Sequence, residues 1–136
     1  MKTLGLLVVL VIACFVVQSC SRSSKYQGPV LEPSAITRDM ISWLYYDRDQ
    51  VQWSADFQPL DTSSLPMKKP EFLKLLTTGN YLPVRIRTRN SSLCYQLYRI
   101  DDKVDKDIRE TIKNKAQTAY RYLQLVGNSF DRFQFY

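Results

Sequence analysis

The stretch PVRIRTRNSSLCYQLYR, residues 83–99, decides the fold. Apolar and polar side chains alternate on both sides of its centre, and a period of two is typical of half-buried strands. The Asn90-Ser91 pair favours a two-residue loop, which would place the apolar residues of both strands on one face. The sequence therefore predicts a β-hairpin over about residues 82–99. The predicted cross-strand pairs are Thr88 with Leu93, Ile86 with Tyr95 and Val84 with Leu97.

The sequence after the hairpin predicts a long helix. Asp101 or Asp102 is a suitable N-cap, and apolar side chains then repeat at steps of three and four residues. An apolar stripe of this kind needs a partner surface, so we expect the helix to cover the hairpin and to end near Gly127. The stripe consists of Ile108, Ile112, Ala116, Ala119 and Leu123.

Three shorter elements are predicted before the hairpin. Ser34 favours a helix start, and residues 35–46 have the apolar spacing of an amphipathic helix. Residues 50–57 alternate as a half-buried strand does, and a short helix is expected to begin at Pro70 and to close at Gly79. Together with the hairpin and the long helix, these elements predict an α+β fold with a small antiparallel sheet.

The start of the chain has the plan of an export signal. Lys2 precedes an uncharged, aliphatic run from Leu4 to Val17. As a helix this run would span roughly 21 Å, well short of the ~30 Å hydrocarbon core of a bilayer. The residues that follow, Val17-Gln18-Ser19-Cys20, resemble the lipobox of bacterial lipoproteins. In that family the cysteine thiol receives a diacylglyceride before the signal is removed.

This resemblance implies cleavage before Cys20 and fatty acylation of Cys20, by palmitate for example. The alternatives are an ordinary signal peptide cut near Ser19 and an N-terminal anchor that is not cleaved. We therefore expect a signal peptide over residues 1–19, a lipidated polar tether over residues 20–33, and a single small domain over residues 34–136.

Composition excludes several classes of function. The chain has no histidine, which excludes Ser-His-Asp and Cys-His nucleophilic sites and histidine-containing zinc sites. It has no CxxC, and once Cys20 is lipidated, Cys94 is the only thiol of the mature chain, so no intramolecular disulfide can form. We predict no catalytic residue, no metal site and no cofactor, and we expect Cys94 on the outward face of the hairpin.

The positions of the basic residues indicate one candidate binding site in the domain. Loss of Lys2 leaves 18 basic and 13 acidic residues, a net charge of +5 that suits an anionic membrane surface. Arg85, Arg87 and Arg89 would project from one side of one strand and could bind a phosphate, a sulfated glycan or an anionic head group. The alternative is a solvated outer face. No nucleic-acid partner is expected.

Two further groups of residues have a structural explanation as well as a functional one. The many Trp and Tyr residues could form a binding platform, although most fall on the apolar faces and favour core packing. Asp101, Asp102, Asp105 and Asp107 could act in acid-base chemistry or bind Ca²⁺. Their place at the start of the long helix favours a capping role, because the helix dipole stabilises negative charge there.

A second resemblance covers residues 42–133. The matching segments are Val51-Gln52-Trp53-Ser54-Ala55-Asp56-Phe57 with Pro59-Leu60-Asp61, Phe72-Leu73, Thr78-Gly79-Asn80-Tyr81-Leu82-Pro83, Tyr95-Gln96-Leu97-Tyr98-Arg99, and Gly127-Asn128-Ser129-Phe130 with Phe133. They resemble the segment that precedes the redoxin domain in some Bacteroidetes thiol-disulfide oxidoreductases of the TlpA type. In that family the chemistry belongs to a CxxC further along the chain, so the resemblance implies a compartment and a scaffold role but no catalytic residue.

The expected function is that of a non-catalytic binding or assembly component of the bacterial cell envelope, held on a membrane by the lipids of Cys20. Its expected partners are that membrane and an envelope protein. The alternative is the N-terminal region of a membrane-bound, TlpA-like thiol-disulfide oxidoreductase whose CxxC domain is missing here. Because no acidic run follows Cys20, we expect the protein to face the periplasm, on the outer membrane, rather than to be displayed on the cell surface.

Overall fold

The computed structural model describes residues 24–133, with the backbone alone for residues 128–133. The expected signal peptide and Cys20 lie outside the described residues. The elements in chain order are β1 (Tyr26–Pro29), α2 (Pro33–Ile36), α3 (Met40–Gln50), β2 (Gln58–Leu60), α4 (Lys69–Leu76), β3 (Tyr81–Thr88), β4 (Cys94–Arg99) and α5 (Lys106–Phe133). Among these residues no helix is both long enough and apolar enough to cross a membrane.

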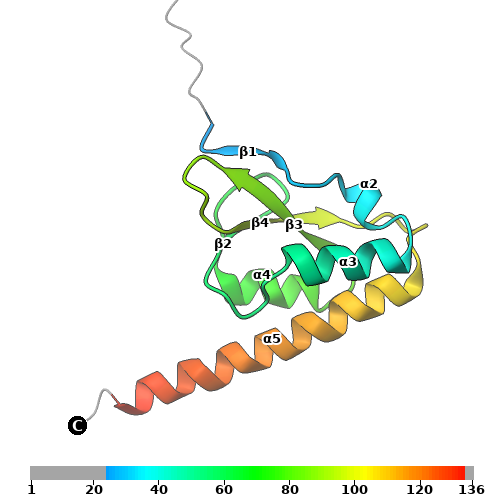
Figure 1. Ribbon diagram of the computed structural model, residues 1–136. Coiled ribbons are helices and arrows are strands. Elements are labelled where there is room, and N and C mark those ends of the chain that lie inside the picture. The colour runs from blue at the N-terminus through cyan, green and yellow to red at the C-terminus, as the bar shows by residue number, and fades with distance from the viewer. Residues whose placement is uncertain (1–23, 134–136) are drawn as a thin grey trace, which may run out of the picture.

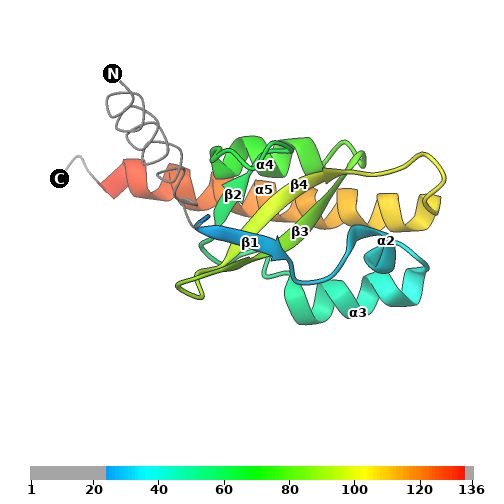
Figure 2. The same ribbon diagram turned by 90° about the horizontal axis from the view of Figure 1, so that it is seen from above.

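The molecule has a layer of sheet above a layer of helices (Figure 1). The strands lie in the order β1-β3-β4-β2, with β3 antiparallel to both β1 and β4, and β2 parallel to β4. Helix α5 runs beneath the sheet, and its C-terminal half projects past the other elements (Figures 1 and 2). The predicted α+β class is confirmed, although the parallel pairing of β2 makes the sheet mixed.

The predicted hairpin is present, but its register is shifted by one residue. Val84 lies opposite Gln96, and Arg85 lies opposite Tyr95. The connecting loop is longer than two residues because Ser91 takes a left-handed conformation, with φ of 56°, and the Thr88 hydroxyl donates to the Ser92 carbonyl at 2.9 Å. A shift of one residue moves every β4 side chain to the opposite face relative to β3.

Cys94 lies in the core, which corrects the expectation that it faces outward, because both faces of β4 are covered: Tyr95 and Leu97 on the opposite face are buried as well. The Cys94 side chain is fully buried. Burial raises the pKa of its thiol to about 11, because the interior disfavours the thiolate. The thiolate is the nucleophilic form of cysteine, so Cys94 is a packing residue at neutral pH.

The expected tether is shorter than residues 20–33, since its second half belongs to the sheet. Tyr26 lies opposite Thr88 and Pro29 lies opposite Ile86. The Val30 amide then donates to the Arg85 carbonyl at 2.9 Å. These backbone hydrogen bonds satisfy the edge of β3, and the domain therefore begins near residue 26 rather than residue 34.

The helix predicted over residues 35–46 is two helices with a break between them. Thr37 ends α2, where its hydroxyl donates to the Pro33 carbonyl at 3.0 Å. Asp39 then starts α3, because its carboxylate accepts from the Ser42 amide at 2.7 Å. Ser34 lies inside α2 and is not the N-cap.

The strand predicted over residues 50–57 is wrong. Gln50 ends α3, a turn follows, and the strand β2 starts only at Gln58. The backbone here forms hydrogen bonds with a side chain instead of with a neighbouring strand. The Tyr95 hydroxyl donates to the Gln50 carbonyl at 2.6 Å and accepts from the Gln52 amide at 2.9 Å. The alternating residues lie in an irregular loop, and Phe57 at the end of this loop is buried in the core.

The two later helices are present, but their first or last residues differ from the predicted ones. Helix α4 starts at Lys69, one residue before Pro70, and Gly79 closes it with φ of 73° as predicted. Helix α5 starts at Lys106, because the Asp105 carboxylate accepts from the Asp107 amide at 2.9 Å, so Asp105 replaces the expected caps. It continues through Gly127, since one exposed glycine costs a helix only about 1 kcal/mol.

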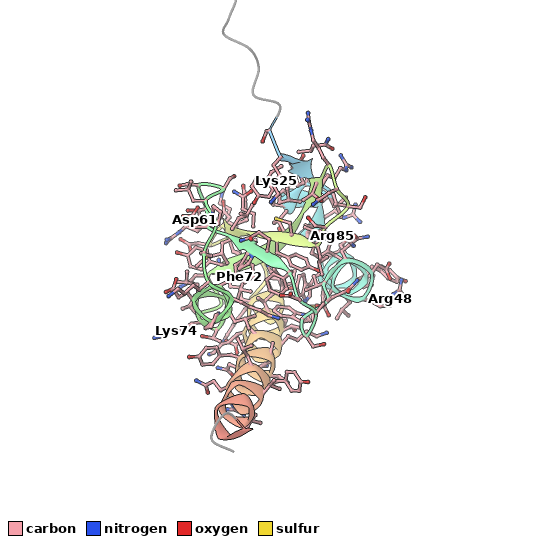
Figure 3. All side chains as sticks on the ribbon, turned by 90° about the vertical axis from the view of Figure 1, so that its left-hand side faces the viewer. Lys25, Arg48, Asp61, Phe72, Lys74 and Arg85 are labelled. Atoms are coloured by element: carbon pink, nitrogen blue, oxygen red, sulfur yellow. The ribbon has the colours of Figure 1, made fainter. Side chains whose placement is uncertain are left out.

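The core lies between the sheet and the three longer helices. Phe72 of α4 lies at its centre beneath the sheet (Figure 3). The Phe57 ring packs edge-on against Tyr95 at 4.9 Å and against Phe72 at 5.5 Å between centroids. Most of the aromatic residues thus serve packing, as the periodicity favoured; Tyr45, Tyr98 and Tyr122 are exposed.

Candidate functional site

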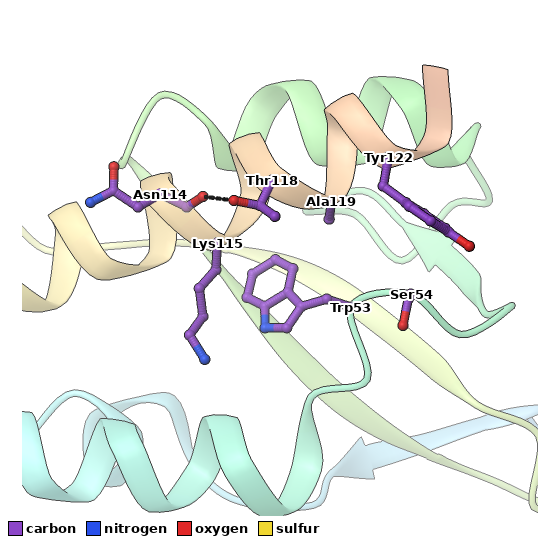
Figure 4. Close-up of a pocket in the computed structure, with 7 residues that line it drawn as sticks. All are labelled: Trp53, Ser54, Asn114, Lys115, Thr118, Ala119 and Tyr122. Atoms are coloured by element: carbon purple, nitrogen blue, oxygen red, sulfur yellow. Dashed lines mark hydrogen bonds between the residues drawn. The ribbon is translucent and has the colours of Figure 1, made fainter. Parts of the chain in front are cut away.

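A groove of about 480 Å³ lies between α5 and the loop that follows α3. We call it the Trp53–Tyr122 groove. Figure 4 shows the Trp53 ring beside the Lys115 side chain, with Tyr122 further along α5. The lining residues are Trp53, Ser54, Asn114, Lys115, Thr118, Ala119 and Tyr122. The chain thus brings together a loop and a helix that are sixty residues apart in the sequence.

A buried carboxylate supports one wall of the groove. Asp47 lies in the last turns of α3 and is only 4% exposed. One of its oxygens accepts from the Trp53 indole N–H at 2.7 Å, and the other bonds to the Lys115 ammonium. Both carboxylate oxygens therefore have a hydrogen-bond donor, as a buried polar group requires. The cluster fixes the orientation of the indole ring and joins α3 to α5.

A second polar cluster anchors the loop to the sheet. The Tyr46 hydroxyl donates to the Pro83 carbonyl at 3.0 Å and accepts from the Arg85 amide at 2.7 Å. Burial raises the pKa of Tyr46 far above its usual range, so this hydroxyl keeps its proton. Together with the two bonds of Tyr95, these contacts hold the end of α3 and the Trp53 loop rigidly against β3 and β4.

The groove presents an apolar surface with few polar groups. The Trp53 indole and the Tyr122 ring, which is 57% exposed, flank the small side chain of Ala119. The Thr118 hydroxyl donates to the Asn114 carbonyl at 3.1 Å within the helix. The Asn114 amide and the hydroxyls of Ser54 and Tyr122 are the lining polar groups that make no side-chain hydrogen bond inside the described part of the chain. Such a surface can receive an apolar or aromatic group and orient it with one or two hydrogen bonds.

The structure separates the three arginines of the predicted anion site. Arg85 is half-buried and donates to the Gln50 side chain at 3.1 Å. Arg87 is exposed and donates to the Val30 carbonyl at 3.2 Å. Arg89 is exposed in the turn, because β3 ends at Thr88. Thus Arg87 and Arg89 remain available to a ligand, whereas Arg85 supports the loop after α3.

Acidic side chains do not form a metal centre in the described part of the chain. No group of three or more His, Cys, Asp or Glu side chains comes close enough there to hold an ion. Asp101 and Asp105 instead accept backbone N–H groups of the turn and the helix start, from Lys103 and Asp107 respectively. The favoured capping role therefore agrees with the hydrogen bond of Asp105, whereas Asp101 stabilises the turn that precedes the helix.

Sequence reasoning missed Asp47, Lys115 and the position of Trp53. The only local signal was that Asp47 and Asp49 flank Arg48 on a predicted helix. Asp49 forms an exposed ion pair with Arg48, whereas Asp47 points into the protein. No spacing rule relates Asp47 to Lys115, because their contact depends on how α3 and α5 pack.

No protein-family model matches this chain, and no curated protein and no solved structure shows significant similarity to it. The resemblances to the lipobox and to the TlpA-type segment therefore stay predictions.

Proposed function

We propose that this protein is a lipid-anchored component of the bacterial cell envelope that binds a protein partner through the Trp53–Tyr122 groove. The observation that carries the binding role is the groove itself, an apolar surface held rigid by the buried Asp47–Lys115 pair. The anchor rests on the export signal and on Val17-Gln18-Ser19-Cys20.

The chemistry of the groove favours a protein side chain over a sugar as the occupant. A sugar ring needs several hydrogen bonds for its hydroxyls, and this groove offers mainly the Asn114 amide and the hydroxyls of Ser54 and Tyr122, spread along an otherwise apolar surface. The groove runs along α5 from Asn114 to Tyr122, whose ring is 57% exposed. An extended surface with an aromatic anchor is typical of protein interfaces.

Thiol chemistry has weaker support than binding. Cys94 is the only thiol after Cys20, and it is buried with its pKa raised to about 11. Disulfide reduction needs an accessible thiolate and a second thiol that resolves the mixed disulfide. A non-catalytic role therefore fits the chain better than the oxidoreductase alternative.

The anchor is tested by Cys20→Ser, since a hydroxyl is a poor substitute for the thiol that receives the diacylglyceride. We expect the parent protein to carry fatty acyl groups by mass spectrometry and to partition into detergent. The Cys20→Ser protein should carry none. Equal detergent partitioning of both proteins after removal of the signal would contradict the lipid anchor.

The groove is tested by a photoreactive benzophenone residue at Tyr122 and, as a control, at Tyr45. Both tyrosines are 57% exposed, but Tyr45 lies on α3 away from the groove. On irradiation of intact cells we expect a discrete protein adduct at position 122 and none at position 45.

A second substitution makes this experiment specific. Thr118→Arg would fill the groove and should abolish the adduct, whereas Thr62→Arg in an exposed loop should leave it unchanged. Adducts of equal yield at both tyrosines, or an adduct that persists with Thr118→Arg, would rule out the groove as the partner site.

A further inference from the structure

The pairing of β1 with β3 brings the start of the domain to the tip of the hairpin. Tyr26 lies opposite Thr88, so Lys25 and Arg89 are the next residues outward from that pair. Lys25 also lines a shallow hollow together with Asn90 and Ser92 of the hairpin loop. The residue that follows the tether and the β3–β4 loop are therefore neighbours in space.

Three basic residues lie near the paired start of β1 and end of β3. Lys25, Arg87 and Arg89, which we call the anchor-end basic surface, are all exposed. Arg87 uses one donor on the Val30 carbonyl, and the Lys25 ammonium lies 5.5 Å from the Tyr26 ring. Within the described part of the chain none of the three forms an ion pair. Asp56 lines the hollow beside Lys25, so the three basic residues together exceed this one acidic residue by two charges.

The distance to Cys20 is short. Lys25 is five positions after Cys20, and an extended chain covers at most about 18 Å over five residues. A lipid on Cys20 would therefore hold the anchor-end basic surface within reach of the lipid head groups. A free polyanion would have no comparable tether to raise its local concentration.

We propose that the anchor-end basic surface binds the anionic head groups of the membrane that holds Cys20, an inference that rests on the proposed lipid anchor. This contact orients the domain with the sheet end toward the bilayer. Lys25 lies at the sheet end of the molecule and α5 lies at the opposite end (Figure 3). The Trp53–Tyr122 groove, on the helix side, then stays open to a partner.

Electrostatic attraction to an anionic leaflet is strong enough to decide orientation. Each basic residue near such a surface changes the ratio of docked to undocked domains by roughly fivefold, so three residues change it by roughly a hundredfold. Salt weakens this attraction, because the Debye length falls to about 3 Å at 1 M. Docking should therefore depend on lipid charge and on ionic strength.

The test uses the acylated, full-length mature protein in vesicles, with a fluorescent dye on Asn90→Cys. Buried Cys94 and acylated Cys20 do not compete for the dye. In vesicles with about one-third phosphatidylglycerol, head-group spin labels should quench this dye strongly. Quenching should fall in pure phosphatidylcholine vesicles and in 1 M salt. A dye on Thr118→Cys, at the groove, should be quenched weakly in all cases.

A control variant with the same net charge distinguishes the effect of the anchor-end basic surface from the effect of the total charge of the protein. The triple variant Lys25→Gln, Arg87→Gln, Arg89→Gln should lose the extra quenching. The triple variant Lys68→Gln, Lys74→Gln, Lys103→Gln removes the same charge from exposed positions elsewhere and should retain it. Equal quenching in charged and neutral vesicles, or equal loss in both variants, would overturn the inference. Absence of acyl groups by mass spectrometry would instead overturn the proposed anchor.

Discussion

At the scale of single residues, burial separates groups that look equivalent in the sequence. Asp47 and Asp49 are two positions apart, yet only Asp47 is buried and bonded to both Trp53 and Lys115. Lys113 and Lys115 differ in the same way: Lys113 lies 3.9 Å from Glu110 on the surface, and Lys115 neutralises a buried charge. The energy of an ion pair depends on whether its loss leaves a charge inside the protein.

Lys115→Met should therefore destabilise the protein far more than Lys113→Met. Without Lys115 the Asp47 carboxylate stays buried with no counter-ion. Breaking a buried pair costs about 3–5 kcal/mol, and we expect about 3 kcal/mol because the Lys115 side chain is itself 44% exposed. The surface pair should contribute less than about 0.5 kcal/mol. Urea unfolding measures both, and equal losses would contradict the role of the Asp47 cluster.

Cys94 should react slowly with alkylating reagents in the native state. Its pKa of about 11 is roughly two units above that of a free thiol, which lowers the thiolate fraction at pH 8 by roughly a hundredfold. An exposed thiol introduced by Asn90→Cys should react at the rate of a free cysteine. The raised pKa also predicts stability that is present below pH 9 and is lost as pH rises toward 11. Rapid labelling of native Cys94 would mean that it is accessible.

At the scale of elements, caps and registers decide where helices and strands begin. Helix α3 starts directly after Asp39, whose carboxylate accepts from the Ser42 amide, and α5 starts directly after Asp105, whose carboxylate accepts from the Asp107 amide. Several Asp, Ser and Thr residues near each predicted start satisfy the same sequence rule. Among these candidates, the residue that caps the helix is the one that lets the apolar side of the helix face the core.

Asp39→Ala should lower the urea midpoint, whereas Ser34→Ala should leave it unchanged, because only Asp39 caps a helix. The hydrogen bond from the Ser42 amide, with smaller help from the Ser42 and Arg38 side chains, lowers the pKa of Asp39 below 3.8. A lowered pKa contributes stability above the unfolded value that is lost as pH falls through the folded value. The difference between parent and Asp39→Ala should therefore vanish in strong acid. A constant difference across pH would exclude the cap.

At the scale of the whole molecule, β1 makes the residues from Tyr26 onward part of the domain. The edge of β3 receives backbone contacts from Tyr26 to Val30. The proposed lipid anchor on Cys20 would therefore connect to a strand through a few residues and would limit how far the domain can move from the membrane. Helices α3 and α5 join on the other side of the core and form the groove there.

A truncation tests this boundary. A chain that begins at Ser24 keeps β1 and should unfold at the same temperature as the mature protein. A chain that begins at Pro33 loses β1 and exposes the β3 edge, so its melting temperature should fall by several degrees, because each kcal/mol shifts the midpoint of a small domain by about 4–8 °C. Equal melting temperatures for the two chains would mean that β1 adds no stability and that the tether extends to residue 33 as first predicted.

The sequence by itself determined the α+β class, the hairpin, the short helix closed by Gly79 and the apolar stripe of α5. These features depend on periodicity and on local backbone chemistry, which neighbouring residues carry. Only the tertiary structure decided the hairpin register, the place of β1 in the sheet, and the burial of Cys94 and Asp47. Each of these depends on contacts between segments far apart in the chain, such as Lys115 with Asp47 and Tyr95 with Gln50, and no local pattern encodes such a contact.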